Sequence, residues 1–245
     1  GTVSGLYRYD GETVLKVYPL PGKVLNLRSP YFPFQPFLSD SKGNLWFYDG
    51  EFSIKRLSAA TGLVEKIPVR SAGRQDSIVK FYPVFYTGNV FEDRKGRIWA
   101  NTTSHGLLRL DKKADCFRPA PFLQKLPVPG NTGNICEDAE GWLWFANRSL
   151  PVRYNPETGE AWFSGHNPQR WPVFNCGSAV YFVDSRQKLW LAEFTNGYRF
   201  DLKTMQLDTL RDVFQASSFV EDQLGRVWFG RYYYNFLTCY DPRTD

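Results

Sequence analysis

The stretch Asp93-Arg-Lys-Gly96-Arg-Ile-Trp99 decides the fold of this chain, because variants of it occur five times. The motif tryptophans follow one another at intervals of 53, 45, 46 and 38 residues. A period of this size indicates an array of similar structural units that stack on their neighbours. The other four copies are Asp40-Ser-Lys-Gly43-Asn-Leu-Trp46, Asp138-Ala-Glu-Gly141-Trp-Leu-Trp144, Asp184-Ser-Arg-Gln187-Lys-Leu-Trp190 and Asp222-Gln-Leu-Gly225-Arg-Val-Trp228.

Each unit reads as four antiparallel strands joined by tight turns. An apolar run such as Val90-Phe91 precedes the motif. The Asp-x-x-Gly turn is expected to close a hairpin, because Asp bonds its own turn and Gly adopts the left-handed conformation. The Trp lies on the second strand, and a third strand such as Leu107–Asp111 leads through another turn to a short fourth strand. Gln187 replaces the glycine in the fourth unit, where a left-handed side chain is mildly strained.

Short alternating strands with one aromatic motif per unit are typical of a β-propeller. We therefore predict an all-β fold, a β-propeller of four-stranded antiparallel blades with about five to six blades in view. We expect one domain over residues 1–245. Because the two ends overlap by a strand, we expect an incomplete array or a chain that continues beyond this sequence. The predicted full repeats are 34–68, 84–120, 132–163 and 178–210, with partial repeats at 1–20 and 216–245.

The composition fits a folded protein with a surface of mixed charge. Of the 245 residues, 42% are hydrophobic and 17% aromatic, which excludes global disorder. The net charge is +5, and the basic residues are scattered among the acidic ones. This pattern favours a surface of mixed charge over one that binds an acidic ligand or polyanion. We also expect no nucleic-acid partner. No apolar run approaches the roughly 18 residues of a membrane span, so we expect no membrane insertion by this segment. No signal peptide is visible.

The cysteines and histidines do not form a metal-binding pattern. The four cysteines show no Cys-x-x-Cys spacing, and no neighbouring ligands accompany His105 and His166, so we expect neither a metal site nor a cofactor. Cys136 stands where the other repeats carry hydrophobic residues, and we expect a buried thiol that packs as a small apolar group. A disulfide between two of the four cysteines is the alternative to free thiols. The other cysteines are Cys116, Cys176 and Cys239.

Strand parity separates two faces of a propeller. In an up-and-down blade, the turns after strands one and three share one face, which we name the turn face. The connections after strands two and four share the opposite face, which we name the loop face. The turn face carries the regular motif turns, whereas the loop face carries long irregular segments rich in Pro, Tyr, Phe and Arg, such as 68–87 and 164–178. Function is expected on such loops, because a rigid scaffold positions them.

The repeat resembles the two-component-regulator propeller repeat. Phe91-Glu-Asp-Arg-Lys-Gly-Arg-Ile-Trp99 with Gly106-Leu-Leu-Arg-Leu-Asp111 is similar to the family pattern, as is Val220-Glu-Asp-Gln-Leu-Gly-Arg-Val-Trp-Phe-Gly230. The resemblance covers essentially the whole chain. It implies the sensor region of a hybrid two-component histidine kinase, in the periplasm or outside the cell, which in that family binds breakdown products of polysaccharides. It also implies further propeller and kinase segments of the same receptor as partners, and a dimer is among the expected arrangements.

Candidate ligand-binding residues lie on the loop face. Aromatic rings beside Arg and Asn suit an oligosaccharide or another small polar ligand, because a sugar offers apolar C–H faces together with hydroxyl groups. The alternative is that the tyrosines pack against the next blade. After the motif tryptophans the chain departs from the Gly-Thr of the family, so the resemblance does not supply the ligand. The candidates are Arg148, Arg170, Trp171, Arg231, Tyr232 and Tyr234, with Asn101 and Asn196 as hydrogen-bonding groups.

No catalytic residues are predicted. The motif aspartates are interpreted as turn caps and the motif tryptophans as core, because each occupies one repeated structural position. We therefore predict a non-enzymatic, ligand-sensing propeller domain. Two alternatives stay open. One is a propeller scaffold for protein–protein or inter-propeller contact, and the other is an enzyme similar to streptogramin lyases, which rely on His and Glu at a metal-assisted site.

Overall fold

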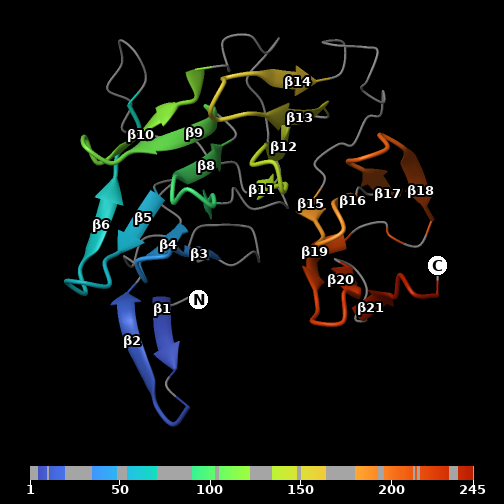
Figure 1. Cartoon of the computed structure of the whole chain (residues 1–245). Coiled ribbons are helices and arrows are strands. Elements are labelled where there is room, and N and C mark those ends of the chain that lie inside the picture. Colours follow the sequence, from blue (N-terminus) through green and yellow to red (C-terminus); the bar gives the residue numbers. More distant parts are fainter. Residues whose placement is uncertain are drawn as a thin grey trace, which may run out of the picture. The chain divides into compact units, whose positions relative to one another are not determined.

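Every described strand pairs with a sequence neighbour in the antiparallel sense, and the strands form one hairpin and five meander sheets (Figure 1). The described ranges contain no α-helix, and no helix among them could cross a membrane. By their contacts the residues form two compact units, Gly1–Ala120 and Pro121–Asp245, and each unit is described by itself. The computed structural model describes residues 5–9, 11–19, 35–48, 54–70, 90–102, 105–121, 134–147, 150–163, 180–192, 196–211, 213, 216–231 and 237–244.

The first unit contains one hairpin and two complete four-stranded meanders among its described residues. The hairpin pairs β1 with β2, and the two meanders follow the orders β3-β4-β5-β6 and β7-β8-β9-β10. The strand bounds are β1 Gly5–Tyr9, β2 Val14–Pro19, β3 Gln35–Ser39, β4 Leu45–Tyr48, β5 Ile54–Leu57, β6 Val64–Ile67, β7 Val90–Glu92, β8 Ile98–Thr102, β9 Gly106–Asp111 and β10 Cys116–Pro119.

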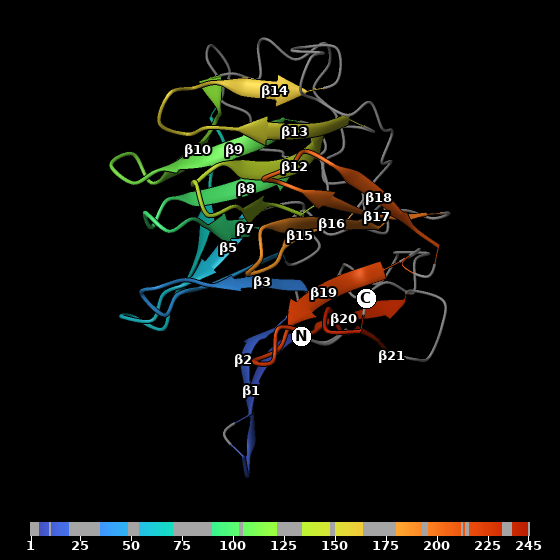
Figure 2. The same cartoon turned by 45° about the vertical axis from the view of Figure 1, so that its right-hand side comes forward.

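The second unit repeats the same meander three times, and Figure 2 follows its strands from a second direction. Two sheets have four strands, and the third, β19-β20-β21, has three among the described residues. The bounds are β11 Cys136–Glu137, β12 Leu143–Asn147, β13 Leu150–Tyr154, β14 Ala161–Phe163, β15 Val180–Val183, β16 Lys188–Ala192, β17 Gly197–Asp201, β18 Leu207–Leu210, β19 Ala216–Glu221, β20 Val227–Arg231 and β21 Leu237–Tyr240.

These sheets confirm the all-β prediction and the four-stranded meander as the repeating unit. The order of strands also places the turns after strands one and three at one end of each sheet, as strand parity requires. The extent of a single domain over residues 1–245 stays a prediction.

The motif turns are closed by the aspartate, as the sequence predicts. In the second complete sheet, Asp93 Oδ1 accepts hydrogen bonds from the backbone N–H groups of Lys95 (3.0 Å) and Arg97 (2.9 Å). Gly96 has a φ of 68°, in the left-handed region, and its N–H donates to the Asp93 carbonyl. Gln187 adopts the same conformation with a φ of 63°, which confirms the predicted exception.

The motif tryptophan is tied to the same aspartate. In all five motifs the indole Nε1–H donates to the second carboxylate oxygen, Oδ2, at 2.8–2.9 Å, so one carboxylate fixes both the turn and the core ring. Four of the rings are buried, which confirms their core assignment. Trp228 is only half-buried, because no further sheet follows the sheet β19–β21 among the described residues of its unit. The five pairs are Asp40–Trp46, Asp93–Trp99, Asp138–Trp144, Asp184–Trp190 and Asp222–Trp228.

Neighbouring sheets within each unit pack through these tryptophans. Trp46 meets Phe117 of the following sheet edge to face, with ring centroids 5.9 Å apart. The second unit repeats this contact with Trp144 and Phe200 at 6.2 Å, and again between Trp190 and the β21 ring of Tyr240 at 4.9 Å. Aromatic pairs of this geometry stabilise a core beyond the area they bury. In these three pairs of sheets, each within one unit, the following sheet therefore covers the motif tryptophan of the sheet before it.

The described cysteines are free thiols. Cys116 is buried, Cys136 is half-buried and packs against the core between its sheet and the next, and Cys239 is exposed. Burial raises the pKa of Cys136, with a smaller contribution from the nearby charge of Asp138, so its thiol stays protonated and acts as a small apolar group. Cys176 lies outside the described residues.

Candidate ligand-binding site

An arginine faces the motif tryptophan across the strands in four of the five sheets. The guanidinium carbon Cζ lies 5.3–5.9 Å from the indole centroid, within the range of cation–π attraction. In the fifth sheet the position opposite Trp228 is Cys239, and Arg226 of the same hairpin stacks on that ring at 5.2 Å instead. The four cross-strand pairs are Trp46–Arg56, Trp99–Arg109, Trp144–Arg153 and Trp190–Arg199.

Carboxylates neutralise most of these arginines. Arg56 pairs with Glu65 on its own sheet at 2.6 Å and with Asp115 on the following sheet at 2.9 Å. Burial alone would lower the pKa of Arg56, but its hydrogen bonds to Glu65 and Asp115 raise it, so the guanidinium stays charged. Arg199 pairs in the same way with Asp208 at 3.0 Å.

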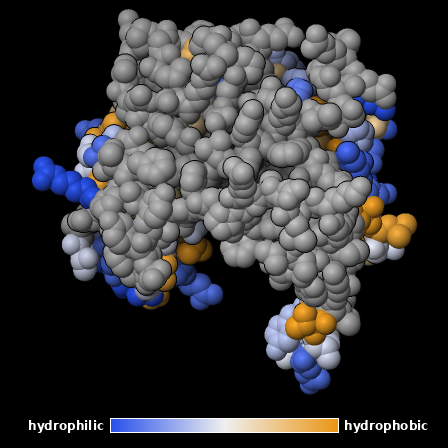
Figure 3. All heavy atoms as spheres, turned by 180° about the vertical axis from the view of Figure 1, so that it is seen from behind, coloured by the Kyte–Doolittle hydropathy of each residue, from blue (hydrophilic) through white to orange (hydrophobic). Residues whose placement is uncertain are grey.

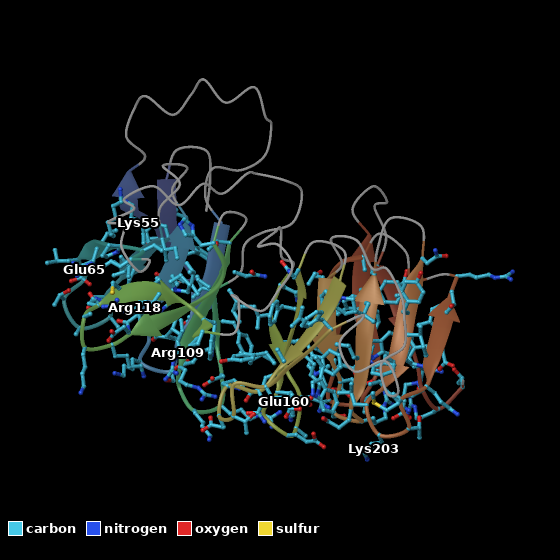
Figure 4. All side chains as sticks on the ribbon, turned by 90° about the horizontal axis from the view of Figure 1, so that it is seen from above. Lys55, Glu65, Arg109, Arg118, Glu160 and Lys203 are labelled. Carbon is cyan, nitrogen blue, oxygen red and sulfur yellow. The ribbon has the colours of Figure 1, made fainter. Side chains whose placement is uncertain are left out.

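The sheet β7–β10 departs from this rule. The residue opposite Arg109 on the fourth strand is Arg118, and Figure 4 shows the two side chains on neighbouring strands. Arg118 pairs with Asp111 at 3.1 Å, which lowers the local positive charge. Two arginines directly opposite each other repel, and the ion pair of Arg118 with Asp111 reduces this repulsion.

Arg153 is buried among three indole rings. Its Cζ atom lies 4.5 Å from the Trp142 centroid and 5.5 Å from that of Trp162. The charge is balanced by Asp138, at 2.8 Å from Nη2, and by Glu140, also at 2.8 Å. A buried guanidinium needs such partners, because an unpaired charge is costly to remove from water.

The motif carboxylates are held in the ionised state. Burial alone would raise the pKa of Asp40, but hydrogen bonds from Trp46 Nε1, from the Asn44 side chain and from backbone N–H groups outweigh it and lower the pKa. Hydrogen bonding, first from Trp228 Nε1, also lowers the pKa of Asp222. A general acid near neutral pH needs a raised carboxyl pKa, so these two groups act as turn caps.

The same hydrogen-bonded contact joins the turn ends of neighbouring sheets at two places in this chain. The N–H and Oγ–H of Ser41, the residue after a motif aspartate, donate to the carboxylate of Glu92 at 2.6 and 2.7 Å. Ser185 and Glu221 repeat the contact at 2.8 and 2.7 Å. We name these contacts inter-sheet latches. They link one motif turn to the residue that precedes the next motif aspartate.

The structure places few of the loop-face candidates. Asn101 is buried in β8, opposite Leu107, at the loop end of its sheet. Asn196 is half-buried and immediately precedes β17, and Arg231 is the last residue of β20, with its side chain outside the described part. The ligand-binding role of these residues stays a prediction. The remaining candidates, Arg148, Arg170, Trp171, Tyr232 and Tyr234, lie outside the described residues.

The described residues contain no group of three or more His, Cys, Asp or Glu side chains that could hold a metal ion. His105 lies in the turn between β8 and β9, where its N–H donates to Thr102 Oγ1 at 3.0 Å. The Thr102 hydroxyl in turn donates to the Gly106 carbonyl, which closes the hairpin. His166 lies outside the described part of the chain.

The sequence reasoning missed the indole–carboxylate bond, the tryptophan–arginine pairs and the inter-sheet latches. A signal for the latches is present in the sequence, since Glu92, Glu137 and Glu221 each stand directly before a motif aspartate. A regular third-strand arginine is likewise visible. Their partners lie on other strands or other sheets, and only the fold brings them together.

The meander sheets and their tryptophan-mediated packing define a protein of the β-propeller class. No protein-family model and no curated protein matches the sequence.

Solved structures of bacterial extracellular domains share this fold. The extracellular domain of the hybrid two component system BT4673 of B. thetaiotaomicron matches 94% of this chain and 32% of its own, with 16% identity and a TM-score of 0.67. Another structure of the BT4673 extracellular domain, described as that of a one component system, matches 100% of this chain and 33% of its own, with 17% identity and a TM-score of 0.69. The extracellular domain of the hybrid two component system BT3049 of the same organism gives 14% identity, a TM-score of 0.53, and coverage of 100% and 37%. The chain thus spans about a third of the length of these structures.

Proposed function

We propose that this chain is a non-enzymatic ligand-sensing propeller domain of a signalling receptor, located in the periplasm or outside the cell. The observation that carries the proposal is the fold shared with extracellular domains of two-component systems over 94–100% of the chain. The similarity extends over several successive sheets, so it concerns the arrangement of repeats and not a single hairpin. Further propeller and kinase segments of the same receptor are the expected partners.

The ligand belongs on the loop face in this proposal. On the turn face, the motif carboxylates are committed to the backbone of their turns and to indole rings, and the arginines to carboxylates and aromatic faces. Such groups hold the scaffold together and have little capacity left for a ligand. Arg231, Tyr232 and Tyr234 follow the fifth motif in the sequence, and we assign them to the loop face because this combination suits an oligosaccharide or a similar polar ligand.

A thermal-shift screen of the chain against oligosaccharides tests this function. A ligand that binds only the native state raises the melting temperature by mass action, by an amount that grows with its concentration. We expect Tyr232→Ala and Arg231→Ala to abolish the shift, and Lys203→Ala to leave it unchanged. Lys203 is a matched control because it is exposed on the turn between β17 and β18 (Figure 4). The absence of a shift with every glycan, or an equal loss in the control, would contradict the proposal.

A propeller scaffold for protein contact is the second candidate. The observation that favours it is the exposure of large hydrophobic side chains on strands β19 and β21, at Val220 and Leu237. Isolated apolar residues are normal on protein surfaces, but several on one sheet mark an interaction surface. A protein partner bound with no glycan response would support this candidate over the sensor.

A further inference from the structure

The sheet β7–β10 and the segment beside it carry three arginines on one face. Arg109 on β9 lies directly opposite Arg118 on β10 (Figure 4). Beyond β10, Val69 forms a parallel bridge with Phe117, and the backbone N–H of Arg70 donates to the Phe117 carbonyl at 2.8 Å. Side chains alternate along extended segments, so this pairing places Arg70 beside Arg118 on the face that holds Arg109. We name Arg70, Arg109 and Arg118 the arginine row.

The described residues provide too few carboxylates to neutralise the arginine row. Arg109 stacks on Trp99 at 5.7 Å but forms no ion pair within the described part of the chain, and the same holds for the exposed Arg70. Arg118 pairs with Asp111 through Nε at 3.1 Å, and neither of its Nη groups has a described acceptor. Exposed guanidinium groups gathered in this way attract oxyanions, which each of them can bind through two parallel hydrogen bonds.

The equivalent positions in other sheets lack this accumulation of positive charge. The fourth-strand residue opposite the third-strand arginine is Glu65 in the sheet β3–β6, Trp162 in β11–β14 and Asp208 in β15–β18. The two acids form ion pairs with their arginines. Arg118 reverses the charge at this position. Hydrophilic side chains reach the surface at several places in Figure 3, so the sign of the charge, and not polarity alone, distinguishes this sheet.

The exposed surface around the arginine row is basic as well. It lies on the two turns of the sheet, which Lys112 joins because its Nζ donates to the Gly96 carbonyl at 2.7 Å. Asp115 is the one acid that is exposed here, and it is already paired with Arg56 at 2.9 Å. Positive charge therefore extends from the arginine row to the turn end of this sheet. The other exposed residues among the described part of the sheet are Arg94, Lys95, Lys112, Lys113, Ala114 and Asp115.

We propose that the arginine row is a binding site for an acidic polysaccharide, a linear chain that carries carboxylate or sulfate groups. Neighbouring strands lie about 4.8 Å apart, so the row presents positive groups at intervals of about 5 Å across the sheet. A chain with repeated negative charges can contact all three guanidinium groups, whereas a small single anion cannot. The site lies near the turn end of its sheet, so it is separate from the ligand site proposed for the loop face.

The chemistry of this surface favours a polysaccharide over other classes of polyanion. Single-stranded nucleic acids stack their bases on exposed aromatic rings, but Phe91, Trp99 and Phe117, the Phe and Trp residues described in this sheet, are half-buried or buried. Membrane surfaces and protein partners both require exposed apolar side chains, for insertion or for an interface core. The exposed residues described here include no apolar side chain larger than that of Ala114.

Isothermal titration calorimetry of the whole chain tests the proposal, with oligogalacturonate as the carboxylate probe and sulfated dextran oligosaccharide as the sulfate probe. We expect at least one of these acidic probes to bind, and a neutral dextran oligosaccharide of matched length not to bind. The dissociation constant should rise with sodium chloride, because salt screens exposed charges. Arg118→Glu should raise it about tenfold or more, since it removes one guanidinium group and supplies Arg109 with a carboxylate, the arrangement found at Arg56.

Lys203→Glu is the matched control, because it changes the net charge equally at an exposed residue of another turn. Arg118→Lys should cause a smaller loss of affinity than Arg118→Glu, because it keeps the charge but not the planar guanidinium group. Near-ultraviolet circular dichroism verifies that the variants fold. Tyr232→Ala, which tests the loop-face ligand, should leave this binding unchanged, so failure of one proposal is distinguishable from failure of the other.

Three outcomes would overturn the proposal. In the first, neither acidic probe binds. In the second, Arg118→Glu weakens binding no more than Lys203→Glu does, which would mean that only the net charge matters. In the third, the chain binds single-stranded DNA, polyglutamate or phosphatidylserine vesicles more tightly than either acidic probe, because the surface would then serve another class of partner.

Discussion

Gln187 Oε1 accepts a hydrogen bond of 2.7 Å from the backbone N–H of Ala139, and this bond joins the turns of two neighbouring sheets. The fourth motif has Val183 before its aspartate, where three others have glutamate. The latch acceptor is therefore missing from its usual place. Gln187 supplies the acceptor from the glycine position, and it does so in a left-handed conformation that disfavours a side chain.

Substitutions at Gln187 should distinguish the stabilisation that the latch provides from the cost of the backbone strain. Gln187→Ala keeps the strained conformation and loses the bond, so we expect a loss of about 1 kcal/mol in unfolding free energy. Gln187→Gly loses the bond but relieves a strain of about 1 kcal/mol, so we expect a stability close to that of the parent. Urea denaturation measures both. If the glycine variant were clearly more stable than the parent, the latch would have no energetic role.

Among the motif aspartates, Asp138 should cause the largest loss of stability when it is replaced by alanine. Its carboxylate accepts bonds from Trp144 Nε1 and from Arg153, and both it and Arg153 are buried. Asp138→Ala leaves the guanidinium without its buried partner, so we expect a loss of about 3–5 kcal/mol, measured by urea denaturation. Asp222→Ala is the comparison, because Asp222 is partly exposed and should cost less. Equal losses of unfolding free energy in the two variants would show that the buried charge of Arg153 does not account for the destabilisation.

Gly197 is required for steric reasons. A Cβ atom at this position would lie 2.4 Å from both the Cβ and the carbonyl oxygen of Val213. Gly197→Ala should therefore destabilise the chain by about 2–3 kcal/mol through overpacking. Gly159→Ala is the control, since nothing lies within 4 Å of its Cβ position and only its φ of +73° opposes the change, by about 1 kcal/mol.

The double variant Gly197→Ala with Val213→Ala gives a sharper result. It removes the two Cγ methyl groups of Val213 but leaves both atoms that the new Cβ would meet, the Val213 Cβ and carbonyl oxygen, so we expect no recovery of stability. A full recovery would mean that the methyl groups of Val213, and not its Cβ and carbonyl oxygen, block the alanine.

The chain should lose stability in acid. Slight burial alone would raise the pKa of Asp201, but hydrogen bonds from Lys188 and from the N–H groups of Lys203 and Thr204 lower it to about 2. Arg243 lowers the pKa of Asp241 to about 2. Because both values lie below the unfolded value of about 3.9, the unfolded state takes up protons first and stability falls as pH decreases.

The pH profile of the urea midpoint checks this expectation. It should be level above about pH 5 and decline between pH 4 and 2, and Asp201→Asn should make the decline shallower. A midpoint that rises on acidification, or a profile that Asp201→Asn does not alter, would contradict the assigned contacts.

Local parts of the fold could be read from the sequence. The five turns, the left-handed Gln187 and the second-strand tryptophans depend on residues within one motif, such as Asp93 and Trp99. The order of strands follows because tight turns force neighbours to pair antiparallel. The same reasoning placed the candidate ligand residues on loops, but it gave no distances between them, because loop geometry depends on contacts that turn chemistry does not specify.

The sequence by itself determined the β-propeller repeat, since its motif specifies a turn, a hairpin and a core ring through contacts of short range. Only the tertiary structure decided which indole faces are covered, which carboxylates neutralise Arg56 and Arg153, and how Gln187 substitutes for a missing glutamate. These outcomes depend on side chains that lie far apart in the sequence or on different sheets. Their energies arise from burial and charge pairing, which exist only after the sheets have packed.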